Sequence, residues 1–85
     1  MTNITEKSRV LKDIKKLKKI MREFVKLKLN KKYCAVYEWV RNYASDAEYF
    51  YKNKDYFSAF GCANYAYGFI DCILILEGKK REESR

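Results

Sequence analysis

Residues 10–24 read VLKDIKKLKKIMREF, and this stretch decides the fold class. Its apolar side chains Val10, Ile14, Leu17, Met21 and Phe24 follow one another at spacings of four, three, four and three residues. That repeat places them along one side of an α-helix. Lysine and arginine fill most positions between them, so the pattern predicts an amphipathic helix over about residues 5–29.

A second helix is expected over about residues 32–52. Its inward positions, again at threes and fours, are Val36, Trp39, Val40, Tyr43, Ala47 and Phe50. The run Asn53-Lys54-Asp55 then predicts a turn. Asn53 tolerates the left-handed conformation that ends helices, and the Asp55 carboxylate can accept hydrogen bonds from the amides that open the next helix.

The third expected helix spans about residues 56–76. Its predicted inward stripe is Phe57, Phe60, Ala63, Tyr67, Ile70 and Leu74. Glycine inside a helix costs about 1 kcal/mol relative to alanine, so Gly61 and Gly68 are expected where a side chain would collide with a neighbour. Gly78 is expected to cap this helix.

The three segments together predict an all-α fold, a small antiparallel three-helix bundle. The chain has no proline and only three glycines, and no segment alternates apolar and polar residues as a strand would. Residues 1–78 are expected to form a single domain, followed by a charged, flexible tail over residues 79–85.

Composition argues against several classes of protein. The longest apolar run, Ile73 to Leu76, is far shorter than the roughly 20 residues of a membrane span, so no membrane contact is expected. The N-terminal residues MTNITE lack the basic and apolar segments of a signal peptide, so a cytoplasmic location is expected. Cys34, Cys62 and Cys72 form no C-x-x-C pair, and the chain has no histidine. The cysteines are interpreted as unpaired core residues, and no metal, cofactor or catalytic site is expected.

Three runs between residues 43 and 71 carry a family resemblance: YASDAEYF at 43–50, DYFSAF at 55–60 and NYAYGFID at 64–71. They resemble the archaeal family catalogued as domain of unknown function 357. The resemblance implies a three-helix bundle from an archaeal cytoplasm, with no established activity, substrate or cofactor. The chain departs from the family pattern at Lys54, where glycine is common, at Phe69, where tryptophan is frequent, and at Cys72-Ile73.

One candidate site is polar. Asn64, Gly68 and Asp71 share a face of the third expected helix at spacings of four and three, and Asp46 of the second helix could join them. One interpretation is a small pocket or docking groove. The other is structural: Asn64 and Asp71 form buried hydrogen bonds that fix the helix register, since a buried polar group needs a partner.

A second candidate is basic. Residues 1–32 carry twelve Lys/Arg against three acids, whereas residues 33–77 carry three against six. The basic side chains opposite the apolar stripe of the first helix are Lys12, Lys15, Lys16, Lys18, Lys19, Arg22 and Lys26. Such a face could hold phosphates by counterion release, or it could simply be solvated. No base-reading motif accompanies it.

The tyrosines form a third candidate. A bundle of this size cannot bury all eight of them, and aromatic residues are enriched at protein interfaces. Tyr49, Tyr56 and Tyr65 are the candidate contact residues, with a homodimer or another protein as the partner. The sequence therefore predicts a non-catalytic interaction or scaffold module, with weak, sequence-independent nucleic-acid binding through the first helix as the alternative.

Overall fold

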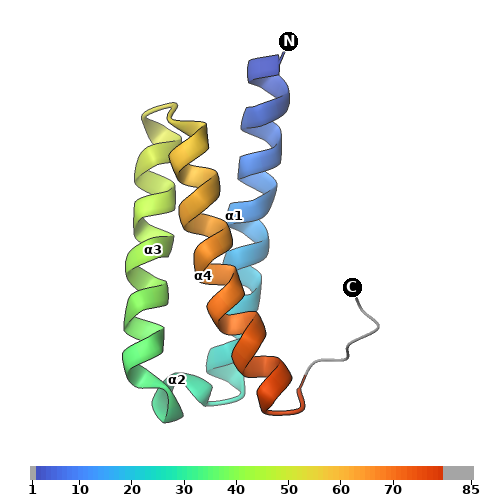
Figure 1. Cartoon of the computed structure of the whole chain (residues 1–85), viewed down its shortest axis with the longest axis vertical. Helices are drawn as coiled ribbons and strands as arrows, with labels where there is room; N and C mark the ends of the chain where they lie inside the picture. Colours follow the sequence, from blue (N-terminus) through green and yellow to red (C-terminus); the bar gives the residue numbers. More distant parts are fainter. Residues whose placement is uncertain (1, 80–85) are drawn as a thin grey trace.

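The computed structural model describes residues 2–79, with side chains from residue 6 onward, and all its regular structure is helical. Four helices follow one another within these residues (Figure 1): α1 (Thr2–Lys26), α2 (Leu29–Lys32), α3 (Cys34–Lys52) and α4 (Tyr56–Leu76). No strand occurs in the part of the chain that is described. The all-helical fold expected from the sequence is therefore confirmed.

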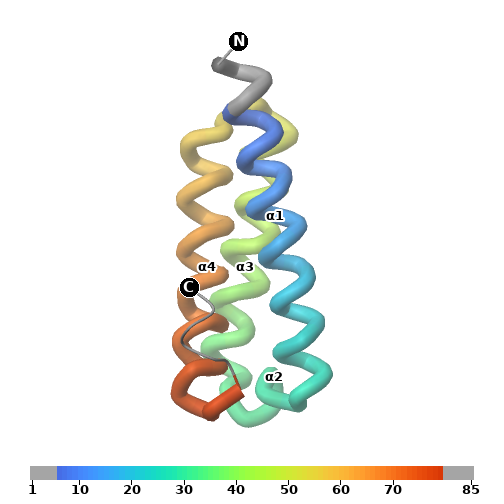
Figure 2. The backbone as a smooth tube through the Cα atoms, turned by 90° about the vertical axis from the view of Figure 1, so that its right-hand side faces the viewer, coloured from blue at the N-terminus to red at the C-terminus, as the bar shows by residue number. Residues whose placement is uncertain are grey.

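Three of the helices are long and lie side by side (Figures 1 and 2). The start of α1 and the turn between α3 and α4 lie at one end of the molecule, and α2 lies at the other. Consequently α3 runs opposite to both α1 and α4. The tail expected over residues 79–85 falls, apart from Lys79, outside the described residues.

The expected count of three helices and the expected end of the first helix at residue 29 are both wrong. The backbone of Lys28 is left-handed, with φ of 62°, and this ends α1 at Lys26. The chain then turns back so that Leu29 is buried, and residues 29–32 form the single turn of α2. At the other end α1 begins at Thr2 rather than at about residue 5.

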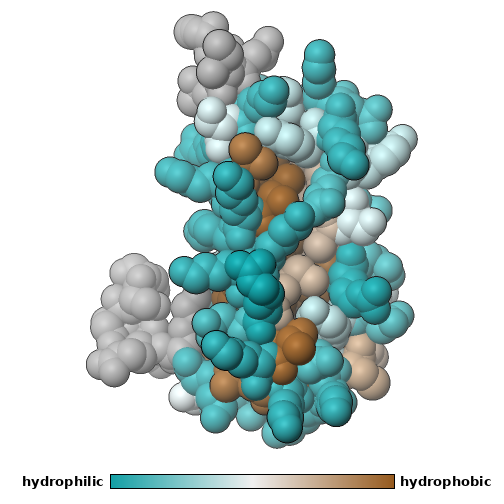
Figure 3. Space-filling model, turned by 180° about the vertical axis from the view of Figure 1, so that it is seen from behind, coloured by the Kyte–Doolittle hydropathy of each residue, from teal (hydrophilic) through white to brown (hydrophobic). Residues whose placement is uncertain are grey.

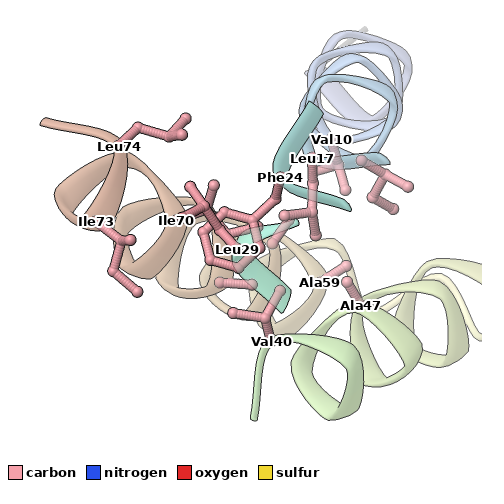
Figure 4. Packing of buried hydrophobic residues seen from close by; sticks show 13 residues of the cluster. Val10, Leu17, Phe24, Leu29, Val40, Ala47, Ala59, Ile70, Ile73 and Leu74 are labelled. Atoms are coloured by element: carbon pink, nitrogen blue, oxygen red, sulfur yellow. The ribbon is translucent and has the colours of Figure 1, made fainter. Parts of the chain in front are cut away.

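The core lies between the three long helices and consists of side chains from all four (Figure 4). The stripe predicted on α1 is confirmed, because four of its five members are buried and Met21 is half-buried. Val40 and Ala47 come from α3. The contribution of α4 is Ala59, Ala63, Ala66, Ile70, Ile73 and Leu74. Small alanine side chains on facing helices let the two backbones approach closely.

The inward stripe predicted for α4 is partly wrong. Phe57 is 88% exposed and Phe60 is 44% exposed, although the other four members are buried or half-buried. On α3, Trp39 was also expected to face inward and is 56% exposed. The cysteines are not core residues either: Cys34 and Cys72 are exposed and Cys62 is half-buried, although all three are unpaired as expected.

For the turn between α3 and α4, one prediction is confirmed and another is wrong. Asp55 accepts a hydrogen bond from the Ser58 amide at 3.2 Å, which confirms it as the N-cap of α4. The left-handed residue is Lys54 (φ 63°), whereas Asn53 keeps a negative φ of −90°. Gly78 has φ of 70° and ends α4 as expected.

Among the described residues, α4 is the helix whose length and mean hydropathy of 1.5 would suit a membrane span. Only a third of its apolar window is buried. A core helix of a soluble protein passes the same test, so this property is weak evidence for a membrane. It does show that α4 has more apolar surface than the other described residues cover.

Candidate interaction surface

The outer face of α4 consists of the residues that this helix leaves exposed. They are Phe57, Phe60, Gly61, Asn64, Tyr65, Gly68, Cys72, Ile75 and Leu76. None of them carries a charge. The single charged residue of α4, Asp71, is half-buried. A surface without charge on a chain in which 35% of residues are charged is unusual, and the core of a protein interface has this composition.

An aromatic row extends this face onto α3. Trp39 stacks on Tyr43 with ring centroids 5.8 Å apart. The Tyr43 and Tyr65 rings form a T-shaped pair with centroids 4.8 Å apart, as do the Tyr65 and Phe69 rings at 5.0 Å. Tyr43 and Phe69 are half-buried. The contacts within the row restrict the ring rotamers, so little side-chain entropy would be lost when a partner binds.

The tyrosines predicted as contact residues differ in exposure. Tyr65 is 52% exposed within the aromatic row, and Tyr49 is 63% exposed with its ring against the edge of Phe50. Tyr56 is half-buried and packs against Tyr51, with ring centroids 5.8 Å apart. Of the three, Tyr65 belongs to the outer face of α4 itself.

Gly61 and Gly68 lie in the middle of the outer face. A Cβ atom built on either glycine would meet no neighbouring atom within 4 Å. The expectation that a side chain there would collide with the rest of the chain is therefore wrong. Each glycine still costs its helix about 1 kcal/mol relative to alanine, and nothing within the described chain compensates for that cost.

The polar candidates differ in their exposure. Asn64 is exposed, and its amide donates hydrogen bonds to the Asp13 carboxylate of α1 at 3.2 Å and to the Phe60 carbonyl oxygen at 3.0 Å. The buried hydrogen bond proposed for Asn64 is therefore wrong, although the bond does join two helices. Asp71 is half-buried, while Asp46 is exposed on α3.

The charge of Asp46 affects another residue of α4, the half-buried Cys62. Burial raises the pKa of the Cys62 thiol, and the charges of Asp46 and Asp55 raise it further. A catalytic cysteine requires the opposite shift. Across residues 2–79 no three cysteine, aspartate or glutamate side chains come close enough to hold a metal ion.

The basic side chains of α1 are all exposed, from Lys12 to Lys26. Lys18 forms a salt bridge with Glu48 of α3, and the Lys16 ammonium lies 5.2 Å from the centre of the Tyr67 ring. Hydrophilic side chains cover most of the molecule when it is viewed from behind, with apolar side chains visible only between them (Figure 3).

Sequence patterning missed Trp39, Phe57, Ile75 and Leu76 as surface residues. The apolar residues of α4 surround the whole helix, so periodicity could not select its buried side. Another feature of the sequence indicated that α4 has exposed apolar residues. Its 21 residues contain a single charge, and in a bundle of three packed helices each helix buries only part of its surface.

Comparison with curated proteins and with solved structures gives no match. A family model described as "Protein of unknown function (DUF357)" matches residues 9–78, which include all of α2, α3 and α4 and most of α1. The match extends well beyond the three runs between residues 43 and 71, and it shows that the chain belongs to the DUF357 family.

Proposed function

We propose that this chain is a non-catalytic protein-interaction module and that its contact surface is the outer face of α4 together with the aromatic row. The observation that supports the proposal is the exposure of large apolar side chains on a face without charge. An exposed apolar patch of this kind is characteristic of a surface that another protein covers. In this proposal α1, α3 and α4 act as one antiparallel bundle that holds the face rigid.

The cysteine chemistry and the distribution of acids agree with a role without catalysis. Cys62 has a raised pKa, and the Asp13 carboxylate accepts a hydrogen bond from Asn64. A contact surface needs no such groups. It needs apolar area, rigid rings and few charges, and α4 supplies each of these.

A retention experiment tests the proposal. The immobilised chain is exposed to an extract of its source cells, beside a Phe57→Lys/Tyr65→Lys variant. The matched control, Val25→Lys/Leu27→Lys, changes two exposed apolar residues at and just beyond the end of α1. We expect the unmodified chain and the control to retain a set of proteins that the Phe57→Lys/Tyr65→Lys variant does not retain. The same retained set for all three chains would reject the outer face as the contact surface.

A second candidate function rests on the exposure of the basic side chains along α1, which lie opposite its buried stripe. These residues would bind the phosphates of nucleic acid without reading sequence. Binding to mixed RNA and duplex DNA across a salt series tests this function. Retention should fall steeply with salt and should be lost on charge reversal at Lys15, Lys19 and Arg22. Retention unaffected by these three substitutions would remove the candidate.

A further inference from the structure

We propose that a second copy of this chain covers the outer face of α4, an inference that rests on the proposed function. The two α4 helices pack against each other in antiparallel orientation, about a two-fold axis that passes between Asn64 and Tyr65. The resulting interface is isologous, with the same patch contributed by both copies.

The spacing of exposed residues along α4 supports a two-fold arrangement. Six of the nine exposed positions of α4, namely 57, 61, 64, 65, 68 and 72, are spaced symmetrically about the point between residues 64 and 65. Antiparallel pairing about that point places Gly61 opposite Gly68 of the second copy. It also places Phe57, 88% exposed, opposite the smaller Cys72 of the second copy. Bulky residues thus meet small ones at both ends.

The two glycines have a role in this arrangement that they lack within one chain. Both are in helical conformation, and both have open space where a Cβ atom would lie. The distance between packed helix axes depends on the side chains at the contact. Glycine opposite glycine lets the two α4 backbones approach closely, so that the flanking aromatic rings can make contact across the interface.

Charge favours a second copy over a partner of opposite charge. The chain has a net charge of +8, and its basic side chains are concentrated on α1. An acidic partner would be attracted to α1 rather than to the uncharged outer face of α4. A second copy that docks through α4 covers residues that carry no charge themselves, and the nearby Asp13 carboxylate is already hydrogen-bonded to Asn64.

The exposed area is close to what a stable dimer needs. With about 200 Å² per aromatic side chain, the exposed fractions of Phe57, Phe60 and Tyr65 amount to roughly 370 Å², and Ile75 and Leu76, 44% and 76% exposed, add to this area. A specific interface buries about 800 Å² on each partner. Asn64, Cys72, the two glycines and the nearby Trp39 can supply the remainder.

Sedimentation equilibrium of the full chain tests the dimer. Gly68→Glu places a charge at the centre of the face, at a position where the single chain leaves open space. The control Ser45→Glu places the same charge on the exposed side of α3. We expect a dimer mass for the unmodified chain and the control, and a dissociation constant at least about tenfold higher for Gly68→Glu, because an unpaired charge would be buried.

Unchanged helical circular dichroism would show that Gly68→Glu still folds. A monomer mass for the unmodified chain at every concentration overturns the inference. A dimer that Gly68→Glu leaves intact overturns it as well, because the contact would then lie elsewhere.

Disulfide cross-linking tests the antiparallel orientation. In a Cys34→Ser/Cys62→Ser background, Phe57→Cys places a thiol opposite Cys72 of the second copy, and oxidation with diamide should give a covalent dimer. The background chain should not cross-link, because its two Cys72 residues would lie about 22 Å apart along the paired helices. Efficient cross-linking of the background chain through Cys72 would show a parallel pair and overturn the proposed orientation.

Three outcomes distinguish a failure of the proposed dimer from a failure of the proposed interaction function. A monomer that retains other proteins through Phe57 and Tyr65 overturns the second copy as partner and leaves the interaction module standing. A monomer that retains nothing through these residues removes both. A monomer that binds phosphatidylglycerol-containing vesicles, and loses them on Gly68→Glu, overturns the inference in favour of a membrane surface.

Discussion

Lys54, like Lys28, has a backbone conformation poorly suited to a residue with a side chain. Its φ of 63° lies in the left-handed region, and its amide donates to the Tyr51 carbonyl oxygen at 3.0 Å to close α3. Glycine adopts this conformation without the steric penalty of a Cβ atom. We expect Lys54→Gly to raise the free energy of unfolding by about 0.5–1 kcal/mol, measured by urea denaturation.

Lys52→Gly is the control for that substitution. Lys52 is the last residue of α3, in helical conformation, where glycine should lower the free energy of unfolding by up to about 1 kcal/mol. A loss of stability at both positions would contradict the role assigned to residue 54.

Residue type predicted this turn only in part. Asp55 could be identified as a cap because its short carboxylate suits that role. Asn53 was chosen as the left-handed residue on the same kind of evidence, yet the bonds that close α3 place that conformation one residue later, at Lys54. A glycine at position 54, common in the family that the sequence resembles, would have marked it.

Glu77 links the end of α4 to the junction between α2 and α3. The Tyr33 hydroxyl donates a hydrogen bond to its carboxylate at 2.5 Å, and the Lys32 ammonium lies 2.9 Å away. The Tyr33 hydrogen bond and then the Lys32 contacts lower the pKa of Glu77. A carboxylate with a lowered pKa stabilises the fold above its unfolded pKa, and that stability is lost as pH falls through the folded pKa.

We therefore expect Tyr33→Phe to raise the pKa of Glu77 toward its ordinary value and to reduce the loss of stability on acidification. Carbon NMR titration of the Glu77 carboxyl group measures the first effect. Tyr37→Phe, at a ring that stacks on Phe24, is the control. A pKa of Glu77 that stays the same in Tyr33→Phe would contradict the assigned cause.

At the scale of the element, α1 could be predicted from sequence far better than α4. Charged residues separate the apolar residues of α1, so the pattern allows one buried side, and that side is buried. The apolar residues of α4 surround the helix, and packing selects the side with Ala59, Ala63 and Ala66 because small residues let α3 approach. Sequence patterning favours large side chains and therefore selected Phe57 and Phe60.

Because one side of α4 is packed and the other is exposed, substitutions on the two sides should change the free energy of unfolding differently. Ala63 is 1% exposed between helices, so Ala63→Leu should lower the free energy of unfolding by about 1–3 kcal/mol through overpacking. Gly68 has open space around it, so Gly68→Ala should raise that energy by up to about 1 kcal/mol in the monomer. Thermal denaturation at concentrations where the chain is monomeric measures both. Equal destabilisation by the two variants would contradict the placement of α4.

At the scale of the whole molecule, sequence predicted the all-helical fold and the family, and the structure changed the account of the surface. Tyr65 was identified from its residue type, but the contact face could not be located until the buried side of α4 was known. The excess of apolar residues in α4 indicated that some of them would remain uncovered. Their position, and the open space at Gly61 and Gly68, required the packed helices.

The central claim is that the outer face of α4 joins two copies of this molecule, and a dilution series followed by amide NMR tests it most directly. Spectra recorded from millimolar to micromolar protein should show concentration-dependent shifts for α4 amides near Phe57, Gly61, Gly68 and Cys72, with little change along the basic side of α1. Shifts confined to α1, or spectra that do not change with concentration, would contradict the account of α4 as the surface that joins two copies.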